Sequence, residues 1–135
     1  MIGPMASAAL WRTAMLRVGI ADRDAVPTDE VDAYRDLCLG DDGGKGYVDV
    51  MRSIRATPLR TERFRDVLDT RVIAHPVRIL WGLDDPILTV RHYGRVALDL
   101  TGLPSLSAIP GRHFLQEDQA VAVAEFIHAT ALLAT

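Results

Sequence analysis

Apolar and polar residues follow two different patterns along the chain, and the change comes at Pro76. Before Pro76, apolar residues recur every three or four positions within polar sequence, which predicts amphipathic helices. After Pro76, short apolar runs at 77–81 and 106–109 predict buried strands, with helices over 90–100 and after 118. The sequence therefore predicts an α/β fold: four helices, then a β-α-β-α segment with an incomplete sheet. The four leading helices are expected at residues 5–18, 29–39, 47–54 and 61–69.

Residue types at the helix ends predict where two of the helices begin. Thr28 and Asp118 belong to the group whose side chains cap the first backbone N–H groups of a helix. We therefore expect Thr28 to cap the second helix and Asp118 to cap the last one. The periodicity also predicts which side chains face the interior. They are Val31, Tyr34, Cys38, Val48, Met51, Phe64, Leu68, Tyr93, Val96, Ala97, Leu100, Val123, Phe126, Ile127 and Ala131, with Ile54 as a further candidate.

A candidate catalytic side chain follows each predicted strand. Gly82 ends the first apolar run, and Asp85 lies three residues later. Gly111 follows the second run and leads to His113. Two parallel strands joined by a helix place both loops at the same edge of the sheet, where the ligand sites of open α/β sheets are found. We therefore expect a carboxylate and an imidazole to meet there.

The two loops carry motifs that resemble those of a known family. The motifs read Trp81-Gly82-Leu83-Asp84-Asp85-Pro86 and Gly111-Arg112-His113-Phe114-Leu115-Gln116-Glu117-Asp118. In this order, with Asp85 and His113 28 residues apart, they resemble the C-terminal part of an α/β-hydrolase. The branch they resemble most holds epoxide hydrolases, haloalkane dehalogenases and related capped esterases.

The resemblance implies a division of the chain and a role for two residues. Residues 1–75 would form a helical cap region, and residues 76–135 would form the C-terminal part of the hydrolase core. Asp85 would be the catalytic acid and His113 the general base of a nucleophile–His–Asp triad. A small apolar ester, epoxide or haloalkane would bind between cap and core and be hydrolysed without a cofactor.

The third member of such a triad is missing from the sequence pattern. In the resembled family the nucleophile precedes the acid and stands on a glycine-flanked turn between a strand and a helix. The candidates without flanking glycines are Ser7, Ser53, Ser105, Ser107 and Cys38. Asp42 does lie in a matching string, Gly40-Asp41-Asp42-Gly43-Gly44, but a predicted helix precedes it, so we expect a loop between helices. We expect the nucleophile upstream of Met1 and the isolated chain to be inactive.

Charge and motif spacing argue against several other classes of function. The formal net charge is −3, and Glu62 and Asp66 interrupt the basic run, so we expect a solvated face and no nucleic-acid partner. The run consists of Arg52, Arg55, Arg60, Arg63 and Arg65. Lys45 follows glycines, but Gly46 stands where a phosphate-binding loop needs Ser or Thr. His75, His92 and His128 lack metal-ligand spacing, so no metal is expected.

The remaining properties suit a cytoplasmic protein without a membrane partner. Cys38 is the single cysteine among 135 residues and cannot form an internal disulfide. The apolar stretch at 5–16 contains Arg12 and is too short to span a bilayer.

Two alternatives to a hydrolase remain open. The first is a non-catalytic remnant or interaction module, because two strands rarely form a stable sheet alone. The exposed edge of 77–81 would then favour self-association or poor solubility. The second is a regulatory helical domain fused to a small α/β piece.

Overall fold

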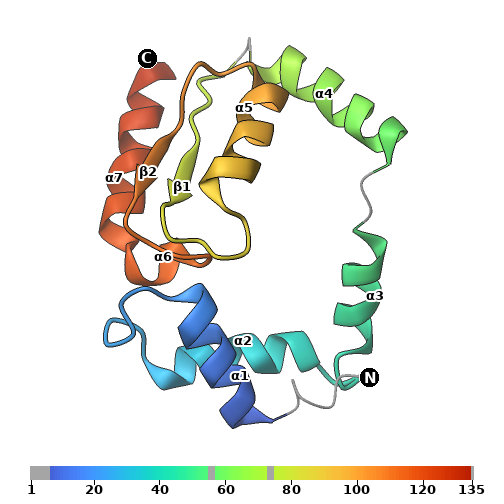
Figure 1. The fold of residues 1–135 in the computed structure, drawn as a ribbon, viewed down its shortest axis with the longest axis vertical. Helices are drawn as coiled ribbons and strands as arrows, with labels where there is room; N and C mark the ends of the chain where they lie inside the picture. Colours follow the sequence, from blue (N-terminus) through green and yellow to red (C-terminus); the bar gives the residue numbers. More distant parts are fainter. Residues whose placement is uncertain (1–6, 55–56, 73–74, 135) are drawn as a thin grey trace.

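The computed structural model describes residues 7–54, 57–72 and 75–134, and these residues are mostly helical (Figure 1). In order, the elements are α1 (Ala8–Ala14), the π-helix η1 (Met15–Gly19), α2 (Thr28–Leu39), α3 (Lys45–Ser53), α4 (Pro58–Val72), β1 (Leu80–Gly82), the π-helix η2 (Val90–Gly94), α5 (Arg95–Thr101), β2 (Ser107–Ile109), α6 (Leu115–Asp118), α7 (Ala120–Ala131) and the 3₁₀-helix η3 (Leu132–Ala134). Met5, Ala6 and Arg55 lie outside the described residues.

The predicted α/β fold is wrong. The described residues contain only two strands of three residues each, which cannot form the sheet layer of an α/β-hydrolase fragment. The strands pair in parallel, with Trp81 opposite Ala108. Pro104 and Pro110 bracket β2, and proline supplies no N–H to a ladder, which helps to explain why this pair stays so short.

The buried hydrophobic core lies in the N-terminal helices rather than against the strands. Its members in the described residues are Met15, Ile20, Val26 and Val31, with Trp11, Leu16, Tyr34 and Phe114 packed against them. The Trp11 indole N–H also donates to the Val31 carbonyl at 3.0 Å, which joins α1 to α2. Phe114 comes from the loop after β2, so this ring joins the N-terminal core to the strand region.

Helices α3 and α4 form an arm that runs from α2 to α5, as Figure 1 shows, and much of their apolar surface is exposed. The prediction that Met51 and Phe64 face the interior is wrong, because both are exposed. The same holds for Tyr93, Val96 and, on α7, Ile127. A 3.6-residue period predicts that a helix has an apolar face, but it does not specify what covers that face.

Two predicted helix caps are also wrong. Thr28 is the first residue of α2 and makes no capping side-chain bond, while Pro27 occupies the N-cap position. Gln119 takes the N-cap position of α7, and Asp118 instead accepts backbone hydrogen bonds from the N-terminal region. Within the described ranges, no helix has the length and apolar character needed to cross a membrane.

Candidate functional site

The loops that follow β1 and β2 are joined by backbone hydrogen bonds. Leu83 N–H donates to the Ile109 carbonyl, and Asp84 N–H donates to the Gly111 carbonyl, both at 2.9 Å. Gly82 makes this approach possible, because a Cβ atom on it would lie 2.6 Å from the Arg112 carbonyl oxygen. The two candidate side chains therefore start from backbone segments that are already in contact.

Asp85 is buried, and both of its carboxylate oxygens have hydrogen-bond partners. Oδ1 accepts the backbone N–H groups of Ile87 and Leu88 at 2.8 and 2.9 Å, and Oδ2 lies 3.0 Å from Nδ1 of His113. Trp81 contacts the same segment, since its indole N–H donates to the Leu88 carbonyl at 2.7 Å. These bonds fix the carboxylate before any ligand arrives.

His113 is the more accessible member of the pair. Its side chain is 25% exposed, against 7% for the side chain of Asp85. The ring also packs edge-on against Phe114, with 5.0 Å between the ring centroids. When Nδ1 carries the proton and donates it to Asp85, Nε2 is left as a basic nitrogen. This is the arrangement that a general base needs.

Burial and hydrogen bonding act in opposite directions on Asp85. Burial disfavours the charged carboxylate, but the hydrogen bonds from His113 and from the backbone N–H groups of Leu88 and Ile87 outweigh it. The pKa of Asp85 is therefore held below its ordinary value, and the group stays ionised at neutral pH.

Replacing Asp85 by asparagine is expected to lower the free energy of unfolding by about 1–3 kcal/mol at pH 7, because charge-assisted bonds to a buried carboxylate are lost. The pKa of Asp85 is lower in the folded state than in the unfolded state. The stabilisation by its carboxylate is therefore complete above the unfolded-state pKa of about 3.9 and is lost as the pH falls through the folded-state pKa. Urea unfolding from pH 7 down to about pH 3 should therefore show the two proteins converging. The exposed Asp84→Asn is the matched control, and a gap that stays constant with pH would contradict the expectation.

Asp42, the discounted nucleophile candidate, lies far along the chain from this pair and is bonded to the backbone at the start of α3. Its carboxylate accepts the N–H groups of Gly44, Lys45 and Gly46 at 2.7 to 3.0 Å. These bonds lower the pKa of Asp42, and the bond from the Gly46 N–H has the largest effect. Helix α2 precedes the loop and α3 follows it, so the prediction of a loop between helices is confirmed.

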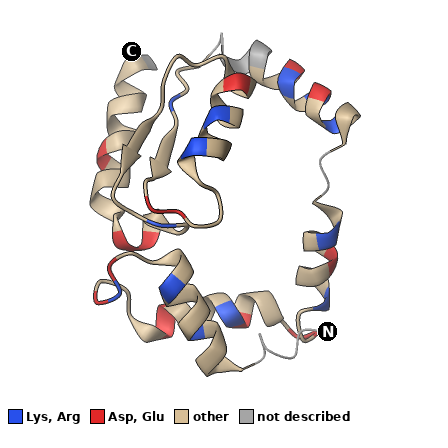
Figure 2. Cartoon of the chain, viewed as in Figure 1, with Lys and Arg blue, Asp and Glu red and all other residues tan. Residues whose placement is uncertain are grey.

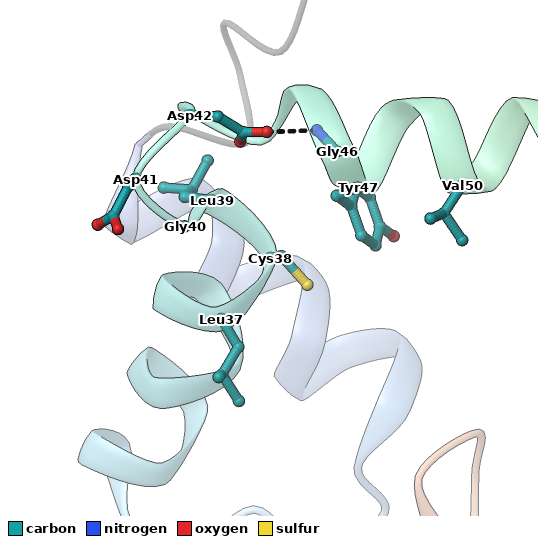
Figure 3. A pocket seen from close by; sticks show the side chains of 9 residues that line it. All are labelled: Leu37, Cys38, Leu39, Gly40, Asp41, Asp42, Gly46, Tyr47 and Val50. Carbon is teal, nitrogen blue, oxygen red and sulfur yellow. Dashed lines mark hydrogen bonds between the residues drawn. The ribbon is translucent and has the colours of Figure 1, made fainter.

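An open pocket of about 550 Å³ lies between α2 and α3, and Figure 3 shows the Asp42 carboxylate at its rim, directed toward Gly46. Cys38, Tyr47 and Val50 are among its lining residues. Burial raises the pKa of the Cys38 thiol, which keeps it protonated and weakly nucleophilic.

The other candidates do not add to the Asp85–His113 pair. Across residues 7–54, 57–72 and 75–134, no serine or cysteine side chain is hydrogen-bonded to His113. Within the same ranges no three His, Cys, Asp or Glu side chains are grouped to hold a metal ion. Figure 2 shows acidic and basic residues interleaved along α3 and α4, and Arg52 pairs with Asp49 at 3.7 Å.

Sequence reasoning missed the residues that support the pair. It took Trp81 only as part of the acid motif, whereas its indole N–H donates to the Leu88 carbonyl beside Asp85. It took Phe114 only as part of the histidine motif, whereas its ring reaches the N-terminal core. Both contacts depend on tertiary packing, and the local sequence contains no signal for them.

Comparison of the chain with known protein families, with curated proteins and with solved structures found no significant match.

Proposed function

We propose that Asp85 and His113 are the acid and the general base of a hydrolase that acts on a small apolar ester, epoxide or haloalkane. The observation that carries the proposal is the 3.0 Å contact between Nδ1 of His113 and Oδ2 of Asp85, whose other oxygen is held by two backbone N–H groups. The resemblance of the two loop motifs to those of epoxide hydrolases and haloalkane dehalogenases supports the same roles.

The chemistry assigned to the pair is the hydrolysis of a covalent ester intermediate. Nε2 of His113 accepts a proton from water, and the water oxygen bonds to the ester carbonyl carbon. The ester C–O bond then breaks, and the imidazolium, which Asp85 stabilises, returns the proton to the departing oxygen. That oxygen is the nucleophile's own in a serine acyl-enzyme and the substrate's in an aspartyl ester. Leu83 and Ile87 flank Asp85 and are each 51% exposed, which supports an apolar substrate.

The nucleophile in this proposal comes from a polypeptide segment outside the described residues. We therefore expect the 135-residue chain to show negligible turnover of p-nitrophenyl butyrate or styrene oxide. A spectrophotometric and a chromatographic assay would measure this. Robust turnover that is lost in His113→Ala would contradict the missing nucleophile, and sensitivity to Asp42→Asn would assign that role to Asp42.

The deciding experiment reads the coding DNA upstream of the Met1 codon and assays the protein that it specifies. A continuing frame with a glycine-flanked serine or aspartate, in a protein that hydrolyses one of these substrates through His113, would support the proposal. A stop codon directly before Met1, together with an inactive chain, would overturn it.

The second candidate function is an interaction module that self-associates through its open strand edges. It is favoured by the two-stranded sheet and by α7, whose described residues are largely apolar yet include no buried one. We expect a mass above that of the 14.8 kDa monomer in light scattering, rising with concentration. A monomer that melts cooperatively at high concentration would count against self-association.

A further inference from the structure

The residues on both sides of His113 are bonded to the C-terminal end of η1. The Arg112 guanidinium donates to the Arg17 carbonyl, and the Phe114 backbone N–H donates to the Gly19 carbonyl at 2.9 Å. Carbonyls in the last turn of a helix lack partners within the helix, so they are free to accept such bonds. His113 is thus held between two attachments to the same short segment.

The Phe114 ring provides a third attachment, and it depends on a glycine. The ring packs against the buried N-terminal core, and its centroid lies 5.7 Å from that of Tyr34. A Cβ atom on Gly19 would lie 2.4 Å from Cδ2 of Phe114, so the ring fills space that another residue at 19 would occupy. The His113 ring packs against the same Phe114 ring, so a displacement of Phe114 would also move the imidazole.

Helix α6, which follows the histidine loop, is fixed to the same region. Asp118 Oδ2 accepts the backbone N–H groups of Ala21 and Asp22, both at 2.7 Å. The Tyr34 hydroxyl donates to Glu117, a bond that raises the pKa of Tyr34. These bonds connect residues more than 80 positions apart in the sequence.

From these contacts we infer that the N-terminal helices position His113 against Asp85, and that Gly19 is the positioning residue because it admits the Phe114 ring. The inference rests on the proposed function of the Asp85–His113 pair and adds that the N-terminal helices align the His113 imidazole with Asp85. Asp85 holds the imidazole at Nδ1, while η1 and α2 hold the backbone that carries it. The expected consequence is that loosening this attachment releases Nδ1 while Asp85 itself stays in place.

The test uses the Gly19→Ala variant and reads which imidazole nitrogen carries the proton. Nitrogen NMR of ¹⁵N-histidine-labelled protein, above the pH at which imidazole is charged, distinguishes the two tautomers, and His113→Gln identifies the His113 signals. We expect the wild type to show the Nδ1–H form with a hydrogen-bonded proton. In Gly19→Ala that proton signal should be lost and the tautomer should shift toward Nε2–H. Gly94→Ala is the control, because the atoms nearest to its Cβ would belong to the side chains of Leu106 and Val90.

A second variant covers the case in which Gly19→Ala does not fold. Arg112→Met removes the guanidinium bond to Arg17 and keeps an apolar stem, so we expect a partial shift in the same direction. Wild-type tautomer and proton signals in Arg112→Met and in a folded Gly19→Ala would overturn the positioning role alone. A wild type without the Nδ1–H bond to Asp85 would overturn the proposed function as well.

Discussion

Replacing His113 by alanine is expected to lower kcat/KM by about 10³–10⁴-fold in the protein assayed together with its nucleophile. In the proposed mechanism the imidazole accepts the proton from the attacking water, whereas Asp85 is buried and both of its oxygens are already hydrogen-bonded. The folded state should survive, because the His113 side chain is only partly buried. Steady-state kinetics on a p-nitrophenyl ester would measure the loss.

The control for this variant is His128→Ala, which removes an exposed histidine on α7. It should leave kcat/KM unchanged. Asp85→Asn provides a second comparison, since it keeps the side-chain shape but no longer stabilises the imidazolium, and it should lower kcat/KM by about 10²–10⁴-fold. Equal activity of wild type and His113→Ala would remove the basis for calling His113 the general base.

The meeting of Asp85 and His113 could be predicted from sequence, whereas the extent of the sheet could not. Two apolar runs ending in Gly82 and Gly111 were enough to place the two loops together, because parallel pairing carries both loops to the same edge. How far a ladder extends depends on its partners. With β2 bracketed by prolines, the predicted strand at 77–81 became the three residues of β1.

Asp118 illustrates a second limit of sequence reasoning. An aspartate before a helix is a good N-cap because its carboxylate accepts backbone N–H groups, and Asp118 does accept two. Those groups belong to Ala21 and Asp22 rather than to α7, and nothing local in the sequence distinguishes the two outcomes. The contact of Phe114 with the N-terminal helices is a tertiary one too, and no local pattern in the sequence predicts it.

Replacing Gly82 by alanine is expected to destabilise the fold by about 3 kcal/mol, at the upper end of the cost of overpacking. The added Cβ would lie 2.6 Å from the Arg112 carbonyl oxygen and 2.8 Å from that of Gly111. Both are backbone atoms, which cannot rotate away as a side chain can. The two loops would have to separate, and the bond from Asp84 N–H to the Gly111 carbonyl would be strained first.

Thermal unfolding would measure this effect, with an expected fall in Tm of roughly 10 °C for about 3 kcal/mol in a chain of this size. Gly94→Ala is again the matched control, because its Cβ would meet Leu106 Cδ2 at 2.9 Å and Val90 Cγ2 at 3.1 Å. Methyl groups of this kind can shift, so its Tm should fall by far less. A Gly82→Ala protein as stable as Gly94→Ala would mean that the loops do not approach this closely. The contact between Asp85 and His113, which depends on that approach, would then be in doubt too.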